Sequence, residues 1–140
     1  TEAVHTIAES PLFEAGPGAR GDRGQVEQLQ LQLLVPGADV CSLVRVLLDH
    51  DDLSVLRLLQ RVRAALPKGG VLLIAEALAG AKGAETVGDA YFSFYLLAMG
   101  KGRARRASEL HRMLQTAGFR KSRELPTRFP IQTGLIVAEV

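Results

Sequence analysis

Acidic and imidazole side chains gather in residues 49–52, which have the sequence DHDD and directly follow an apolar stretch, DVCSLVRVLL, at 39–48. Histidine titrates near neutral pH, and a neighbouring carboxylate can orient its ring. Asp49 and His50 are therefore candidates for a general base or a ligand contact. The alternative is that these four residues cap a helix and form a solvated turn.

A second acid, Glu76, lies inside the otherwise apolar run VLLIAEAL at 71–78. A buried carboxylate is costly unless it is hydrogen-bonded or paired with a cation. Glu76 is therefore either a site residue or one half of a satisfied ion pair, and the sequence leaves both interpretations open.

Four of the seven aromatic residues fall within five positions: Tyr91, Phe92, Phe94 and Tyr95. Three of them share one face of a helix at i, i+3, i+4 spacing, which is typical of core packing. The alternative is that they form, with Met99, the wall of a pocket for a long apolar ligand, because small-molecule sites are mostly apolar.

Basic residues are only slightly in excess. The chain has 17 Lys and Arg against 15 Asp and Glu, and they are scattered, so the composition does not indicate a nucleic-acid partner. The one dense basic segment, KGRARR at 101–106, is either a phosphate patch or a solvated loop between helices.

The pattern of elements that must position these groups is α/β. Apolar runs at 39–48 and 71–78 predict strands buried in a parallel sheet, and the helical pattern at 53–66 predicts the crossover between them. We also expect helices at 89–99 and at 108–117, the latter ending at Gly118, and strands at 119–125 and 133–140.

The N-terminal part is less regular. Residues 1–14 predict a short helix broken near Ser10-Pro11, and 26–33 predict a half-buried strand. The whole resembles half of an open doubly wound sheet. Ligands of such sheets bind at the carboxyl ends of the strands, which is where Asp49, His50 and Glu76 fall.

Composition excludes several protein classes. The single cysteine, Cys41, cannot form an internal disulfide, and three isolated histidines give no ligand set for a metal. No run of about 18 apolar residues or signal peptide is present. We expect a cytoplasmic protein, and the start at Thr1 without methionine leads us to expect a fragment.

Three segments resemble S-adenosylmethionine-dependent O-methyltransferases, in their C-terminal half: SLVRVLLDHDD at 42–52, RAALPKGGVLLIAEAL at 63–78 and ELHRMLQTAGFRKSRELPT at 109–127. GDAYFSFYLLAMGKGRAR at 88–105 and the DHDD sequence are most similar to the carotenoid O-methyltransferases of purple photosynthetic bacteria, which act on hydroxyneurosporene or demethylspheroidene. The resemblance covers 38–140, whereas 1–37 match poorly.

This resemblance implies the C-terminal half of a Rossmann-like class I methyltransferase sheet, mostly parallel with a reversed last strand. The implied reaction transfers methyl from S-adenosylmethionine to a carotenoid hydroxyl. Two alternatives remain: a non-catalytic fragment or binding domain, and a methyltransferase acting on a phenolic or polyketide molecule.

The site residues implied by the resemblance transfer unevenly. The family's glycine-rich cofactor loop has no counterpart, so cofactor-binding residues stay unassigned. The family's base histidine aligns with Leu48, its first supporting glutamate with Glu76, and its second with Ala104. Asp49 and His50 are thus the remaining candidates for the base, with Glu76 beside them.

The implied substrate also favours the pocket interpretation of the aromatic segment, because a carotenoid is long and almost wholly apolar. A lipophilic substrate suggests peripheral contact with the inner membrane. Members of the family dimerise through an N-terminal helical region, so we expect the full-length protein to be a homodimer.

Overall fold

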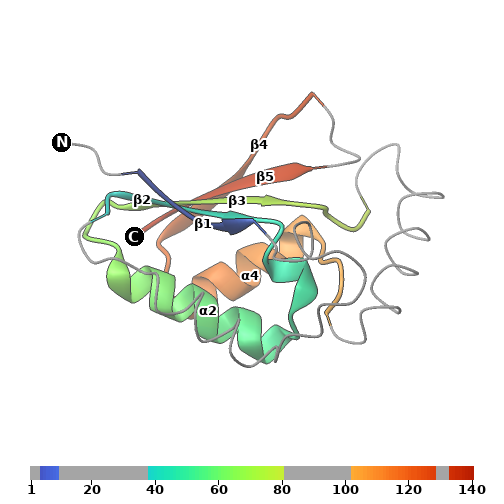
Figure 1. The fold of residues 1–140 in the computed structure, drawn as a ribbon, viewed down its shortest axis with the longest axis horizontal. Coiled ribbons are helices and arrows are strands. Elements are labelled where there is room, and N and C mark those ends of the chain that lie inside the picture. Colours follow the sequence, from blue (N-terminus) through green and yellow to red (C-terminus); the bar gives the residue numbers. More distant parts are fainter. Residues whose placement is uncertain (1–3, 10–37, 81–101, 129–132) are drawn as a thin grey trace.

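The computed structural model describes residues 4–9, 38–80, 102–128 and 133–140, and its centre is a five-stranded mixed sheet (Figure 1). The strand order is β1-β2-β3-β5-β4. The strands are β1 (Val4–Glu9), β2 (Val40–Val44), β3 (Val71–Glu76), β4 (Lys121–Leu125) and β5 (Gly134–Glu139). The first three run parallel, and β5 is antiparallel to both its neighbours. The predicted reversed last strand is confirmed.

Among the described residues, two helices pack on one face of this sheet: α2 (Asp52–Ala65) and α4 (Ala107–Ala117) (Figure 1). A short 3-10 turn, η2 (Leu47–Asp49), lies between β2 and α2. In the described part of the chain, neither helix is long and apolar enough to cross a membrane.

Local chemistry sets the ends of both helices. The Asp51 side chain accepts a hydrogen bond from the Ser54 amide at 2.8 Å, which caps the start of α2 as predicted. At the other end Leu66 precedes Pro67 and is extended, since a residue before proline avoids helical geometry. Helix α4 ends at Gly118, whose φ of 98° is left-handed, again as predicted.

The core lies between the helices and the sheet. Every second side chain of the central strands points to this face, including Cys41, Leu43, Leu72, Ile74 and Ile136. The helices contribute buried residues at helical spacing: Val55, Leu58, Leu59 and Val62 from α2, and Leu110, Leu114 and Ala117 from α4. This packing fixes the direction of β2 and β3, whose carboxyl ends carry the acidic candidates.

Two predictions about elements are wrong. The strand expected over 39–48 ends at Val44, because Arg45 takes a left-handed backbone (φ 52°) and the chain turns into η2. The short helix expected over 1–14 is instead strand β1, whose β-branched residues suit an extended chain and which pairs in parallel with β2. The remaining described elements begin and end within two residues of their predicted positions. The strand expected at 26–33 and the helix expected at 89–99 lie outside the described residues.

Candidate active site

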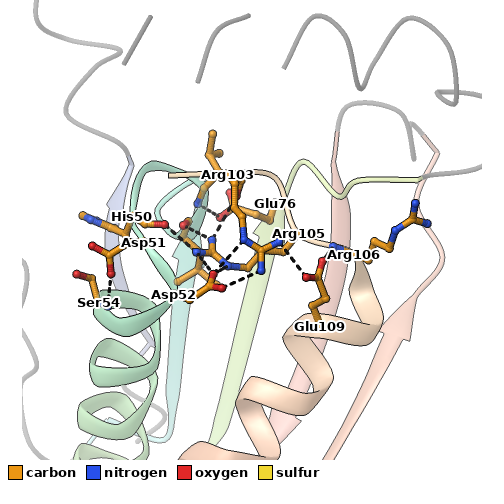
Figure 2. A network of polar contacts seen from close by, with 11 residues as sticks. His50, Asp51, Asp52, Ser54, Glu76, Arg103, Arg105, Arg106 and Glu109 are labelled. Atoms are coloured by element: carbon orange, nitrogen blue, oxygen red, sulfur yellow. Dashed lines mark hydrogen bonds and ion pairs between the residues drawn. The ribbon is translucent and has the colours of Figure 1, made fainter. Parts of the chain in front are cut away.

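The acidic candidates meet at the carboxyl edge of the sheet. Strands β2 and β3 pair in parallel, with Val44 opposite Ala75, so Glu76 at the end of β3 lies beside the chain that leaves β2. That chain forms the 47–50 turn, which joins β2 to helix α2 (Figure 2). Segments 28 residues apart in sequence therefore share one small region.

Glu76 is buried, with 3% of its surface exposed. Its Oε2 accepts a hydrogen bond from the Leu48 amide at 2.9 Å, whereas its Oε1 has no hydrogen-bond partner among the described residues. Burial raises the pKa of this carboxyl to about 8, the Leu48 and Leu47 amides and the Arg105 charge oppose the rise, and the Asp49 charge adds to it. Among the described residues, the direct hydrogen-bond partner of Glu76 is the Leu48 main-chain amide, and no cation pairs directly with its carboxylate.

Leu48, Asp49 and His50 differ in whether their side chains can accept a proton and in whether they lie near Glu76. Leu48 is 6% exposed and its side chain carries no group that could take a proton. Asp49 is half-buried and its charge acts on Glu76. The half-buried His50 points its ring away from Glu76 in Figure 2. The structure thus brings Asp49 and Glu76 into one region and leaves the imidazole to one side.

Arg105 is the site residue that the sequence did not reveal. Its side chain is only 2% exposed and donates to the Leu47 carbonyl at 2.7 Å, the His50 carbonyl at 2.7 Å and Asp52 Oδ1 at 2.9 Å. The solvated-loop interpretation is wrong for this residue. Arg103 and Arg106 in the same segment are exposed, so composition gave no signal that could single out Arg105.

The residues before Arg105 lie beside the same turn. Arg103 pairs with Asp52 Oδ2 and Glu109 Oε1, each at 2.9 Å. Its hydrogen bond lowers the pKa of Asp52, whereas the pKa of Glu109 is lowered first by the Arg106 amide and then by Arg103. Gly102 lies directly against the Leu48–Asp49 peptide, where an added Cβ would collide with the Leu48 carbonyl. The segment 102–105 therefore covers the 47–50 turn from outside.

The predicted pocket residues Tyr91, Phe92, Phe94, Tyr95 and Met99 lie outside the described residues. The two ends of the segment that contains them do lie side by side. The Ala79 amide donates to the Arg105 carbonyl at 3.0 Å, and Leu78 forms a parallel bridge with Arg105.

A pocket of about 580 Å³ opens next to this junction. Its lining includes Leu78 and Gly80 after β3, Ser108 of α4, Leu125 of β4 and Leu135 of β5. The lining also includes Arg106, Glu124 and Thr127, so the pocket combines apolar side chains with charged and polar ones.

The described residues contain no candidate metal site. No group of three or more His, Cys, Asp and Glu side chains among them is placed to hold a metal ion. Gly102 lies against the Leu48 carbonyl, and among the described residues no glycine-rich loop follows β2. No contact with S-adenosylmethionine is therefore assigned to a described residue.

Comparison with known proteins gives consistent matches. Residues 18–120 match the model of the O-methyltransferase domain. The demethylspheroidene O-methyltransferase of Rhodobacter capsulatus is 50% identical over 93% of this chain and 31% of its own length, and that of Cereibacter sphaeroides is 43% identical over 73% and 27%. The structure of human N-acetylserotonin methyltransferase in complex with SAM superposes with a TM-score of 0.63 at 28% identity, covering 78% of this chain and 31% of that one. The chain spans about a third of the length of these curated relatives.

Proposed function

Because this chain belongs to the O-methyltransferase domain family, we propose that it forms the C-terminal part of an enzyme that methylates a carotenoid hydroxyl with S-adenosylmethionine as methyl donor. The proposed substrate class is supported by the 50% identity to a demethylspheroidene O-methyltransferase over 93% of the chain. The proposed substrates are accordingly of the hydroxyneurosporene or demethylspheroidene type. The proposed boundary places the family's C-terminal part at 38–140.

Of the three proposed catalytic residues, Glu76 is the one that the geometry supports as proton acceptor. A hydroxyl that becomes an ether must lose its proton, and a base works best when its pKa lies near the working pH. Glu76 has a pKa of about 8 and one carboxylate oxygen without a partner among the described residues. Asp49 supports this role because its negative charge raises the proton affinity of Glu76. His50, with its ring turned away, contributes its carbonyl to Arg105.

The proposed substrate wall consists of the aromatic segment and the pocket beside it. Replacing Phe94 by alanine should raise KM for the carotenoid and leave KM for S-adenosylmethionine unchanged, because only the apolar contact area changes. Leu53, which is 58% exposed on α2, provides the control: Leu53→Ala should leave both constants unchanged. Equal effects of the two variants would remove Phe94 from the proposed wall.

The substrate class is tested with the natural protein that contains this chain. Purified protein is incubated with S-adenosylmethionine labelled in its methyl group and either a hydroxylated carotenoid in detergent or a phenol. We expect label in the carotenoid fraction. Label only in the phenol would exclude the carotenoid assignment and favour the phenolic alternative.

A second candidate function is that the 140-residue chain by itself does not catalyse methyl transfer. The observation in its favour is that no described residue is assigned to the cofactor. Calorimetric titration of the isolated chain with S-adenosylmethionine should then show no heat of binding. Measurable binding would exclude this alternative.

The lipophilic substrate also supports peripheral contact with the inner membrane, and we propose a homodimer for the full-length protein. Vesicle flotation tests the first proposal and sedimentation velocity tests the second. Protein that stays with the vesicle-free fraction, or that sediments as a monomer at micromolar concentration, would contradict the respective proposal.

A further inference from the structure

We propose that Arg105 is a positioning residue for the reaction: its guanidinium holds the 47–50 turn against the end of β3, so that the Leu48 amide stays on the Glu76 carboxyl. The kinetic test of this inference depends on the proposed function, because it measures methyl transfer. Its structural test needs no substrate.

The contacts of Arg105 are directed at main-chain atoms. Two of its acceptors are the carbonyls of Leu47 and His50, both at 2.7 Å, on either side of the residues that face Glu76. A guanidinium suits this task because its donors are fixed in a plane and can reach several acceptors at once. A buried cation is costly without partners, so its 2% exposure makes these contacts obligatory.

The same turn is held from inside the molecule by Glu76. Oε2 of Glu76 takes the Leu48 amide, which lies in the chain between the two carbonyls bound by Arg105. The 47–50 turn is therefore fixed at three main-chain groups, two from Arg105 and one from Glu76 (Figure 2). Without Arg105 the turn loses two of these three contacts, and we expect the Leu48 amide to leave the Glu76 carboxylate more often.

Arg105 also joins this turn to the chain that follows β3. Its carbonyl accepts the Ala79 amide at 3.0 Å while its side chain holds the turn. One residue thus connects the turn beside Glu76 with the start of the segment that carries the proposed substrate wall. A shift of either part changes the distance between the carboxylate and the bound substrate.

The test compares three variants of the natural protein. Arg105→Met removes the donors and the charge, Arg105→Lys keeps the charge without the planar fork, and Arg103→Met is the control. Arg103 shares the partner Asp52 but is exposed, and its guanidinium pairs with Asp52 and Glu109 and not with the Leu47 or His50 carbonyl. Misplacement of reacting groups by about 1 Å costs about 100-fold in rate, so we expect kcat to fall about 100-fold in Arg105→Met and to change by less than about threefold in Arg103→Met.

The pH profile separates positioning from general loss of structure. Among the described residues, the charges that act on Glu76 are those of Asp49 and Arg105, and Arg105 lowers its pKa. Arg105→Met should therefore shift the rise of kcat with pH to higher pH. Arg105→Lys should restore the midpoint of that rise without restoring the full rate.

Amide hydrogen exchange over residues 47–50, measured without substrate, gives the structural readout. Exchange should accelerate at least about tenfold in both Arg105 variants and stay unchanged in Arg103→Met.

Unchanged exchange in folded Arg105→Lys overturns the inference, as does an equal loss of kcat in Arg103→Met. If the wild-type protein methylates no carotenoid, the proposed function fails, while the exchange data still decide the role of Arg105. If Arg105→Met does not fold, Arg105→Lys carries both measurements.

Discussion

The carboxylate of Glu76 and the main-chain amide of Leu48 meet at 2.9 Å, so the acid at the end of β3 binds the backbone of the turn and not a side chain on it. Any residue except proline provides such an amide. The contact is therefore independent of the side chain at position 48, where the resemblance leads us to expect the family's histidine and the chain has leucine. The absence of that histidine leaves the placement of Glu76 intact.

Replacing Glu76 by glutamine should lower kcat of the natural enzyme by about 100-fold or more, since loss of a positioned general base typically has this effect. The amide keeps the shape and accepts from Leu48 but cannot take a proton at neutral pH. Glu139→Gln at the exposed end of β5 is the matched control and should keep full activity. A rate unchanged in Glu76→Gln would remove Glu76 from the catalytic group.

Glu76 should also make the stability of the chain depend on pH. Its pKa rises on folding from 4.5 to about 8, so the folded state binds the proton more tightly and the stabilisation is complete below pH 4.5. It is lost as pH rises from about 4.5 to about 8, by at most about 1.4 kcal/mol per pH unit.

Urea unfolding at a series of pH values, compared between wild type and Glu76→Gln, isolates this contribution. The wild type should lose stability relative to the variant through this interval, and the difference should level off above pH 8. Parallel curves for the two proteins would show that Glu76 titrates normally in the folded state.

Gly102→Ala should displace the 47–50 turn. Gly102 has φ 97°, and an added Cβ would meet the Leu48 carbonyl and the Asp49 backbone, so strain and collision act together. Gly69→Ala is the matched control because φ is 84° there but nothing lies within 4 Å of the added atom. We expect the control to lose about 1 kcal/mol in urea unfolding and Gly102→Ala to lose about 3 kcal/mol, with a fall in activity only in the latter. Equal losses of unfolding free energy in the two variants would show that the 47–50 turn accommodates the added Cβ without strain.

Cys41 can report whether the 140-residue chain folds alone. It is the single cysteine, is 3% exposed on the inner face of β2, and burial raises the pKa of its thiol to about 11. The shift alone reduces the reactive thiolate about 100-fold. Alkylation should be at least that much slower in native buffer than in concentrated urea, measured by mass spectrometry. Equal rates would mean that the isolated chain does not form this core.

The sequence predicts those parts of the fold that depend on local chemistry. Asp51 caps the start of α2 with its side chain, and Gly118 ends α4 because glycine readily adopts a left-handed backbone. Both positions are confirmed. The end of β2 at Val44 depends instead on Arg45, a residue type that seldom adopts a left-handed backbone. Strand β1 depends on pairing with β2, a contact between segments more than 30 residues apart.

The site divides in the same way. Glu76 was identifiable because an acid in an apolar strand requires a partner. Arg105 was not, because its burial results from acceptors at Leu47, His50 and Asp52, which only the folded chain brings to it. From the sequence alone, Arg103, Arg105 and Arg106 are equivalent, and only the folded 47–50 turn distinguishes Arg105 from the other two.

The hydrogen bond between Ala79 and Arg105 brings the two ends of the intervening chain together beside the end of β3. A segment whose ends are held together in this way can change in length at little cost, because the closure cost of a loop grows only slowly with its length. We therefore expect exchange of residues 81–101 to leave the pairing of β3 with its neighbours unchanged. The acid at the end of β3 and the turn that holds it stay where they are.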